Sequence, residues 1–367
     1  MILMNDFKAE SVQLRDAMLN AVRRVLDSGW YILGQEVLNF EKSWANCCGV
    51  KHGIGVGNGM DALEISLRSL NIGLGDEVIT TPMTAFATVL AIMRAGASPV
   101  LADIDPETAL MSLESAKRCL SPKTKAVVLV HLYGQIRDMD RWTQFCEESQ
   151  LFLIEDCAQA HCASWRGQVA GSFGEVGAYS FYPTKNLGAV GDAGMVVTND
   201  EKLAERARLL RNYGQSERYY HDHVGLNSRL DEIHAAMLLA KINFLSEYTM
   251  RRRHVANIYK NQIFTKEVQA LVMPQEDDSH VYHLYVVICK ERDLLQKKLL
   301  SSTIQSLIHY PVPIHKQKPC LSLKRDPLGL VHSEQHAASC LSLPCHPQMT
   351  DQDVEFVVEA VNSFQGA

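Results

Sequence analysis

The sequence has no strong excess of charge of either sign, which limits the partners that it can bind. It carries 36 Lys and Arg residues against 42 Asp and Glu residues, a formal net charge of −6 at pH 7. The densest basic run is Arg251-Arg252-Arg253, which we expect to form a solvated helix face. Nucleic-acid binding needs a broad basic surface that neutralises phosphates. The composition therefore argues against a nucleic-acid partner.

Long apolar runs and regularly spaced cysteines are also absent. No stretch approaches the roughly 20 apolar residues that span a bilayer, and Met1–Asp6 lacks the basic and apolar regions of a secretion signal. None of the ten cysteines forms a CxxC spacing, so neither a disulfide framework nor a zinc site is expected. We therefore expect reduced thiols, a cytoplasmic location, no membrane partner and no bound metal.

The sequence does contain an alternation of short β-rich runs and amphipathic helical segments up to about residue 200. With 367 residues, 47% of them hydrophobic, the chain is long enough for two domains. Helical segments are predicted near 8–27, 59–70, 86–95, 112–119 and 138–149. The predicted strands are Gly53–Val56, Glu77–Thr80, Pro99–Ala102, Ala126–Val130, Phe152–Glu155, Gly177–Ser180 and Gly194–Thr198. This alternation predicts a mostly parallel sheet covered on both faces.

The pattern changes beyond residue 200. Long helical segments are predicted near 200–212, 229–245, 247–263, 292–308 and 351–364, with a β-rich stretch at Tyr282–Cys289. We therefore predict an α/β protein with a large domain, residues 1–245, and a smaller C-terminal α+β domain, residues 246–367.

Open parallel sheets bind ligands where the carboxyl ends of strands meet, and four such segments here carry residues of interest. The first is the turn Gly55–Asp61, GVGNGMD, between a predicted strand and a helix. Its glycines would let the backbone approach a phosphate at the helix N-terminus. The spacing is not the dinucleotide fingerprint, however, so an ordinary connection is equally consistent with it.

The second segment places Asp156 after a hydrophobic strand, with Gln159 three residues later. A carboxylate opposite a pyridine nitrogen keeps that nitrogen protonated and makes the ring an electron sink. The alternative is that Asp156 is a helix N-cap. His161, at the end of the same run, is more typical of a packed polar residue than of a catalyst.

The third segment carries Lys185, in the run SFYPTKNLG at Ser180–Gly188. Most lysines are simply surface residues. Lys185 differs because it follows a buried-looking strand and precedes an uncharged glycine-rich stretch. A desolvated amine has a depressed pKa, which suits it to form an imine and to carry a proton. The fourth segment, Gly225–Glu232, which contains Asn227, is typical of a helix start, where a capping role is the default.

Together these motifs resemble the DegT/DnrJ/EryC1/StrS family of sugar aminotransferases. The matching segments are Val56–Leu63, Gly75–Ile79, Glu155–His161, Ser180–Leu187, Gly191–Val197, Asn227–Ala236, His309–His315 and Leu341–Pro347. The resemblance covers nearly the whole chain. It implies the aspartate-aminotransferase type of fold (fold type I), which binds pyridoxal 5′-phosphate.

The resemblance also implies catalytic roles. Lys185 would hold pyridoxal phosphate as a Schiff base and would move a proton between cofactor and substrate. Pyridoxamine phosphate would be the intermediate form of the cofactor. Asp156 would face the pyridine nitrogen, and Gln159 would lie near the ring hydroxyl.

For the cofactor phosphate, the resemblance implies contacts from two places. The backbone at Gly59 and Met60 and the hydroxyl of Ser180 would hold it within one chain. Asn227 would reach the phosphate of a neighbouring subunit, which implies a homodimer with shared active sites.

Within the family, four segments resemble enzymes that make 3-amino-3,6-dideoxyhexoses on dTDP: Ser28–Gly34, Ile54–Leu63, Val130–Gln135 and Leu210–Gly214. The implied reaction moves an amino group from glutamate to a dTDP-3-keto-6-deoxyhexose, for a surface polysaccharide or a glycosylated natural product. A 4-keto-6-deoxy sugar nucleotide is the alternative substrate. The substrate pocket would draw on Tyr31, Tyr182, His309, Tyr310 and His315.

Two positions depart from the family pattern. Many relatives have an aromatic residue directly after the first threonine of the segment that here is Thr84-Ala85-Phe86-Ala87-Thr88. Phe86 would stack on the cofactor ring only through a shifted loop; otherwise the stacking is provided differently. Cys162 stands where glycine is usual.

Two other functions are weighed against transamination. Related sugar dehydratases replace the lysine with histidine, so Lys185 argues against dehydration. A non-catalytic regulator with the same fold is disfavoured because no DNA-binding appendage or basic arm is visible.

Overall fold

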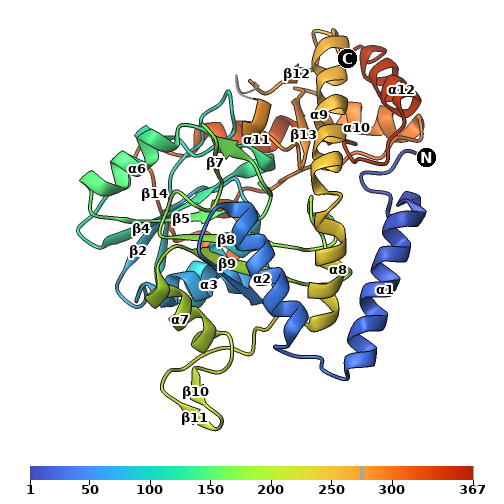
Figure 1. Ribbon diagram of the computed structural model, residues 1–367. Helices are drawn as coiled ribbons and strands as arrows, with labels where there is room; N and C mark the ends of the chain where they lie inside the picture. The colour runs from blue at the N-terminus through green and yellow to red at the C-terminus, as the bar shows by residue number, and fades with distance from the viewer. Residues whose placement is uncertain (273–276, 367) are drawn as a thin grey trace.

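The computed structural model describes residues 1–272 and 277–366, and its centre is an eight-stranded sheet (Figure 1). Within this sheet only β9 runs opposite to its neighbours, so the predicted mostly parallel α/β sheet is confirmed. The strand order is β1 (His52–Val56), β9 (Gly194–Thr198), β8 (Val176–Ser180), β5 (Phe152–Asp156), β4 (Thr124–Val130), β2 (Glu77–Thr80), β3 (Ser98–Leu101) and β14 (Lys324–Arg325).

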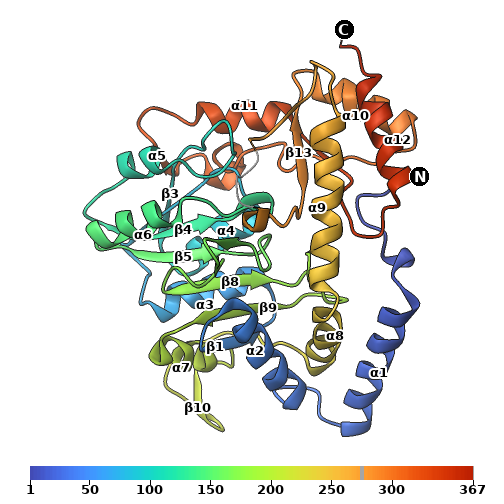
Figure 2. The same ribbon diagram turned by 45° about the horizontal axis from the view of Figure 1, so that its top comes forward.

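Helices cover both faces of the sheet (Figure 2). One layer contains α3 (Gly59–Ser69), α4 (Phe86–Arg94) and α7 (Glu201–Leu210); the other contains α2 (Gln35–Cys48), α5 (Leu113–Arg118), α6 (Met139–Glu148) and α8 (Glu232–Ile242). Side chains alternate between the layers along each strand. In β4, Ala126 and Val128 pack into the first layer, and Val127 and Leu129 pack into the second. The strands are thus buried on both sides, as in other parallel sheets.

The C-terminal part of the chain has its own apolar core. There α9 (Leu245–Gln262), α10 (Arg292–Ser301) and α12 (Asp351–Asn362) pack on an antiparallel sheet of β12 (Gln269–Ala270), β13 (Tyr285–Ile288) and β15 (Cys340–Leu343). Two segments cross the predicted boundary at residue 245: β14 joins the large sheet, and Ile2 pairs with Ile304. The division into residues 1–245 and 246–367 stays a prediction.

Three helices differ from the sequence expectations. The helix α2 and the helix α11 (Val331–Ser339) were not expected. In α11 the buried residues include Ser333 and His336, so its apolar pattern is weak. The helix predicted near 292–308 ends at Ser301, because the residues that follow turn to pair with the N-terminal segment at Ile2.

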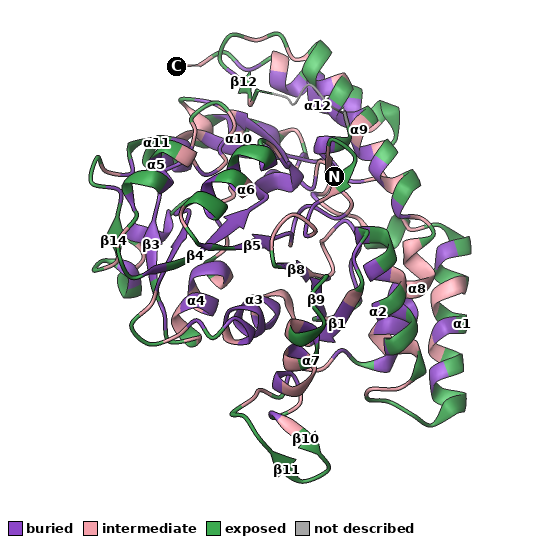
Figure 3. Cartoon of the chain, turned by 60° about the vertical axis from the view of Figure 1, so that its left-hand side comes forward, coloured by how far each residue is buried: buried purple, intermediate pink, exposed green. Residues whose placement is uncertain are grey.

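Two parts of the chain lie outside these layers. The helix α1 (Val12–Ser28) packs along α8, and the hairpin of β10 (Gln215–Glu217) and β11 (Tyr220–His221) projects from the body. A shorter hairpin joins β6 (Ser164–Trp165) to β7 (Gln168–Val169). In Figure 3 the β10–β11 hairpin is largely exposed, in contrast to the central strands. None of the described helices is long and apolar enough to cross a membrane.

A buried ion pair fixes the strand that leads into the GVGNGMD turn. Glu41 of α2 and Arg211, which follows α7, are each less than a tenth exposed, and the guanidinium of Arg211 contacts the carboxylate of Glu41. Arg211 also donates to the carbonyl of Gly55 at 2.9 Å, and the N–H of Gly55 donates to Glu41 at 2.8 Å. One carboxylate therefore ties α2, β1 and the end of α7 together.

Replacing Glu41 with glutamine would leave the buried guanidinium of Arg211 without its counter-charge. Removal of one partner from a buried pair costs about 3–5 kcal/mol. We expect Glu41→Gln to lower the free energy of unfolding by about 3 kcal/mol in urea denaturation. Glu36→Gln, which disrupts a more exposed pair with Arg24, is the control and should cost less than about 1 kcal/mol. Equal losses in the two variants would contradict this account.

Candidate active site

The carboxyl ends of the parallel strands meet at one edge of the large sheet. Asp156, the last residue of β5, pairs with Ala178 of β8, two residues before that strand ends at Ser180. The amino end of β9 lies at the same edge, where Gly194 pairs with both Val56 and Ser180. This edge therefore brings together the GVGNGMD turn, the Asp156 run and the Lys185 run, which are far apart in the sequence.

The GVGNGMD turn and Ser180 form a cradle that is too tight for a side chain. A Cβ atom at Gly59 would lie 2.6 Å from the Cβ of Ser180. Gly59 also begins α3, and the first N–H groups of a helix have no acceptor within it. The cap residue Asn58 satisfies the N–H of Asp61. The N–H groups of Gly59 and Met60, with the hydroxyl of Ser180, can therefore hold an anionic group.

Asp156 presents a buried carboxylate at the end of β5. The hydroxyl of Thr88 donates to its Oδ2 at 2.8 Å, and the N–H of Ala158 donates to its Oδ1 at 3.1 Å. Burial raises the pKa of Asp156, while these two donors and the charge of Lys185 oppose the rise. A turn and no helix follows Asp156, so the N-cap interpretation is wrong.

Lys185 lies in the turn beyond β8, where its N–H donates to the carbonyl of Tyr182 at 2.8 Å. Burial lowers the pKa of its side-chain amine to about 8, and the charge of Asp156 opposes that shift. An exposed lysine has a pKa of about 10.4. Lys185 therefore has a much larger neutral fraction near pH 7, which is the form that attacks a carbonyl carbon.

Gln159 lies in the turn after Asp156 and is held on both sides. Its Oε1 accepts the N–H of Tyr133 at 2.6 Å, and its Nε2 donates to the hydroxyl of Tyr310 at 3.2 Å. Tyr310 belongs to the C-terminal part of the chain, and burial raises its pKa to about 12, so its hydroxyl stays protonated. For the neighbouring His309, burial and then the charge of Lys185 lower the pKa to about 4. Asp156, Gln159, Lys185, His309 and Tyr310 thus form one cluster.

Four other predicted site residues have exposed side chains. Tyr31 is 52% exposed, Tyr182 51% and Phe86 36%, and Asn227 is also exposed. Among the described contacts, none of these four side chains bonds to the cluster. The segment Gly225–Glu232 does lead into a helix, because α8 begins at Glu232 with Asp231 as its N-cap residue, and Asn227 lies before that cap. Their roles toward cofactor and substrate stay predictions.

His315 is the remaining predicted residue, and it is buried. Its Nε2 lies 2.9 Å from a carboxylate oxygen of Glu334 in α11, and no described hydrogen bond joins it to Gln159 or Lys185. Its role in the substrate pocket also stays a prediction.

Sequence reasoning missed three residues that hold this cluster. Thr88 bonds to Asp156, and Tyr133 bonds to Gln159. His283 holds the residue after Lys185, because its Nδ1 lies 3.1 Å from the Oδ1 of Asn186. Thr88 stands in the segment that resembles the family's aromatic loop, so this motif could have pointed to it. His283 comes from a distant segment, and nothing local marks it.

The structure also shows the surroundings of two residues, His161 and Arg252, whose roles the sequence left open. His161 is fully buried among Trp44, Tyr179 and Phe181, and burial lowers its pKa to about 3, so it is a packed neutral residue as expected. The solvated face expected for the arginine triplet is wrong at Arg252. Its guanidinium is buried and donates to backbone carbonyls of the C-terminal part.

One buried group has the ligand types of a metal site, namely His131, Glu155 and Cys157, whose ligand atoms lie within 4.8 Å of one another. Glu155 is already saturated. Its carboxylate accepts the N–H groups of Gly171, Phe173 and Gly174 and contacts His131 at 2.8 Å. Because these partners use its lone pairs, we assign the group a structural role near the carboxyl end of β5.

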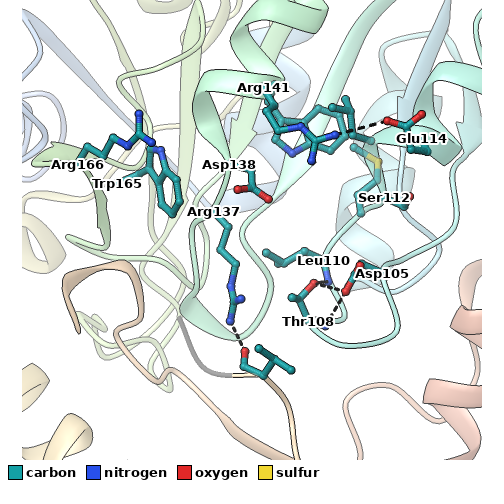
Figure 4. Close-up of a pocket in the computed structure, with 14 residues that line it drawn as sticks. Asp105, Thr108, Leu110, Ser112, Glu114, Arg137, Asp138, Arg141, Trp165 and Arg166 are labelled. Carbon is teal, nitrogen blue, oxygen red and sulfur yellow. Dashed lines mark hydrogen bonds and ion pairs between the residues drawn. The ribbon is translucent and has the colours of Figure 1, made fainter. Parts of the chain in front are cut away.

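A cavity of about 570 Å³ shares no lining residue with this cluster (Figure 4). Charged groups of both signs surround it. Arg141 lies 3.5 Å from Glu114, and Arg166 lies 2.8 Å from Asp140. The guanidinium of Arg137 donates to the carbonyl of Val272. Because positive and negative groups balance there, the cavity lacks the net charge that would select an anion.

The residues at this edge of the large sheet fit each part of pyridoxal phosphate. The Gly59 and Ser180 cradle suits the phosphate, the buried Asp156 suits a protonated ring nitrogen, and the amine of Lys185 suits the aldehyde. The tight approach at Gly59 and the lowered pKa of Lys185 are physical features of the chain itself, so the fit does not depend on the sequence resemblance.

Cofactor uptake should depend on the ionisation of Lys185. Imine formation needs the neutral amine, and the neutral fraction of Lys185 rises as the pH rises through about 8. We expect the rate at which cofactor-free protein takes up pyridoxal phosphate to increase with pH and to level off above about 8. The absorbance of the bound cofactor would follow it in stopped-flow mixing. A rate that stays flat from roughly pH 6.5 to 9 would show that this amine does not limit uptake.

Comparison with known proteins gives consistent matches over the whole chain. The model of the DegT/DnrJ/EryC1/StrS aminotransferase family matches residues 12–362. A dTDP-3-amino-3,6-dideoxy-alpha-D-galactopyranose transaminase of Aneurinibacillus thermoaerophilus is 44% identical over 99% of both chains. Other relatives are named for UDP- and GDP-linked sugars.

Solved structures match equally well. DesV of S. venezuelae, in complex with a ketimine intermediate, has a TM-score of 0.94 at 39% identity and covers 99% of this chain and 97% of its own. The NtdA structure from Bacillus subtilis, with bound cofactor PMP, has a TM-score of 0.89 at 27% identity and covers 96% and 82%. The chain therefore belongs to the DegT/DnrJ/EryC1/StrS aminotransferase family, whose members depend on pyridoxal phosphate.

Proposed function

We propose that this protein transfers an amino group from glutamate to a dTDP-3-keto-6-deoxyhexose and so forms a dTDP-3-amino-3,6-dideoxyhexose. The observation that carries the aminotransferase assignment is the cluster of Asp156, Gln159 and Lys185 beside the Gly59 cradle. The choice of sugar rests on the name of the Aneurinibacillus relative, which is 44% identical.

Pyridoxal phosphate, when bound, supplies an aromatic ring that withdraws electrons from the substrate carbon. The chain's own residues would do the rest. The N–H groups of Gly59 and Met60 and the hydroxyl of Ser180 would hold the phosphate, and Asp156 would keep the ring nitrogen protonated. Thr88 and Ala158 aim the carboxylate of Asp156, since each donates to one of its oxygens.

Lys185 would move the proton. Its Nζ would act first as a general base that takes a proton at the substrate carbon and then as a general acid that gives it up. With a pKa of about 8, roughly a tenth of the amine is neutral at pH 7 and the rest is protonated, so both the base form and the acid form are present. Asn186, bonded to the carbonyl of Val281 at 2.9 Å, anchors the chain directly after the lysine.

The substrate would enter from the side of the C-terminal part, where His309 and Tyr310 lie over Gln159. Both side chains are largely buried and would help to exclude water. Tyr31, Tyr182 and His315 complete the proposed pocket, and Phe86 is proposed to stack on the ring.

A second copy of the chain would complete each site. Asn227 is exposed and bonds to neither its own cradle nor its own Lys185 in the described contacts. We propose that it contacts the phosphate bound to the other subunit, with the β10–β11 hairpin at the interface. The exposed Tyr219, Tyr220 and Val224 support this interface, because large apolar side chains gathered in one exposed segment are typical of a contact surface.

The alternative function is transamination of a 4-keto-6-deoxy sugar nucleotide. The test is to incubate the cofactor-loaded protein with glutamate and each of a matched pair of 3-keto and 4-keto dTDP-sugars. We expect 2-oxoglutarate and an amino sugar with the 3-keto substrate. Turnover with the 4-keto sugar alone would favour the alternative. No 2-oxoglutarate with either sugar would reject the proposed function.

A further inference from the structure

Tyr133 contacts two segments of the candidate active site, the turn that carries Gln159 and the segment that carries His309. It follows β4, has a left-handed backbone with φ of 63°, and its side chain is 1% exposed. Its N–H donates to Oε1 of Gln159 at 2.6 Å. At its other end, the hydroxyl lies 2.5 Å from the carbonyl oxygen of His309 and 2.8 Å from Nε2 of His336 in α11. One residue therefore joins the Gln159 turn to the segment that carries His309 and Tyr310.

The His309–Tyr310 segment is held at three further points. Nδ1 of His309 lies 2.8 Å from the hydroxyl of Ser342, which is fully buried in β15. The hydroxyl of Tyr310 accepts a hydrogen bond from Gln159. Leu307 and Ser342 exchange backbone hydrogen bonds of 3.2 and 2.7 Å. With Nδ1 engaged, the imidazole of His309 has only Nε2 left for a ligand.

The positions of two protons follow from these distances. Burial keeps Tyr133 protonated, because it raises the pKa well above 10, and keeps His336 neutral, because it lowers the pKa to about 4. Tyr133 thus has one proton to donate. Two oxygen atoms 2.5 Å apart need a proton between them, so the hydroxyl of Tyr133 donates to the carbonyl of His309. Nε2 of His336 must then carry the imidazole proton and donate it to the Tyr133 oxygen.

We propose that Tyr133 and His336, the latter as the Nε2–H tautomer, are positioning residues that fix the His309–Tyr310 segment above Gln159 for the sugar substrate. This inference rests on the proposed function. Neither residue touches the reacting atoms. Tyr133 holds the carbonyl of His309, and His336 holds the hydroxyl of Tyr133. Together they set the positions of the His309 ring and the Tyr310 hydroxyl relative to the sugar.

The geometry favours positioning over simple packing. Any buried tyrosine needs partners for its N–H and its hydroxyl. Tyr133 differs in which partners it has, because its N–H holds the Gln159 turn and its hydroxyl holds the carbonyl of His309. A shift of about 1 Å in a group that orients a substrate lowers the rate by up to about 10²-fold. The half-reaction with the sugar should therefore be far more sensitive to Tyr133 than the half-reaction with glutamate.

The first test locates the protons directly. Neutron diffraction from deuterated crystals of the cofactor-loaded protein should show deuterium on Nε2 of His336 and the O–D of Tyr133 pointing at the carbonyl of His309. Deuterium on Nδ1 of His336 instead, with Nε2 bare, would overturn the tautomer assignment. This readout does not depend on turnover.

The second test is Tyr133→Phe, which removes the hydroxyl but keeps the ring and the N–H that bonds Gln159. Tyr259→Phe is the matched control, because the hydroxyl of Tyr259 is equally buried and donates to the carbonyl of Pro344 at 2.8 Å, within the core of the C-terminal part. Both variants should lose similar stability in thermal unfolding. In single-turnover measurements, Tyr133→Phe should lower the apparent second-order rate constant of the sugar half-reaction by about 10- to 100-fold relative to Tyr259→Phe.

A third variant pair tests the donor role of His336. In His336→Gln the amide Nε2 can still donate to Tyr133, whereas His336→Leu cannot. The glutamine variant should therefore retain much more of the sugar half-reaction than the leucine variant. Equal losses in these two, or equal sugar kinetics in Tyr133→Phe and Tyr259→Phe, would overturn the positioning role. A wild-type protein that transfers no amino group to either sugar would reject the proposed function and this role with it, while the neutron result would still decide the tautomer.

Discussion

Replacing Lys185 with alanine is expected to lower the rate of amino transfer by about 10³- to 10⁴-fold, because the change removes both the amine that holds the cofactor and the group that moves the proton. Burial lowers the pKa of the Lys185 amine to about 8, and the negative charge of Asp156 opposes that shift.

The variant should still bind pyridoxamine phosphate, since the Gly59 cradle and Asp156 remain. Binding can be measured by calorimetry with the cofactor-free protein, and the rate by release of 2-oxoglutarate. Lys42→Ala, at an exposed position of α2, is the control and should behave as wild type. If Lys185→Ala kept more than about a tenth of the wild-type rate, the assignment of Lys185 would be wrong.

Replacing Asp156 with asparagine is expected to lower the rate of amino transfer by about 10²- to 10³-fold. The amide has nearly the same shape but carries no charge, so it cannot stabilise a protonated ring nitrogen, and removing one such preorganised electrostatic partner typically costs this much. Asparagine also presents an N–H₂ group to either Thr88 or Ala158, both of which donate hydrogen bonds to the native carboxylate.

This loss should appear in steady-state rates with saturating glutamate and sugar, while circular dichroism stays unchanged. Asp140→Asn is the control, because Asp140 is exposed and pairs only with surface groups such as Arg166. If Asp156→Asn matched this control, the carboxylate would not face the ring nitrogen, and the cofactor would have to lie differently from the proposed arrangement.

Much of the fold could be predicted because its signals are local. The predicted strand Glu77–Thr80 has the same bounds in the structure, and Gly194–Thr198 does as well. Each is a short apolar run between polar turns, a pattern typical of a strand buried on both faces. The end of α10 was misjudged because its stop depends on the pairing of Ile304 with Ile2, about 300 residues away.

The residues of the candidate site also fall into two groups, those that local motifs mark and those that matter through distant contacts. Asp156, Ser180 and Lys185 stand in short motifs next to strand ends, so their sequence context marks them. His283 carries no such mark, and the motif Val130–Gln135 that contains Tyr133 does not reveal what its hydroxyl contacts. Tyr133 matters because its hydroxyl reaches His309, and His283 because it contacts Asn186. Both contacts join residues more than 90 positions apart, and one-dimensional patterns contain no information about them.

The sequence by itself determined the alternation of strands and helices, the glycine-rich turn and the lysine that follows a buried strand, because each depends on neighbouring residues. Only the tertiary structure decided how these pieces act on one another. It lowered the pKa of Lys185 by burying it, closed the Gly59 cradle against Ser180, and joined Tyr133 and His336 to His309. The reason is physical: burial, charge and hydrogen bonding depend on distance in space, and only the folded chain sets those distances.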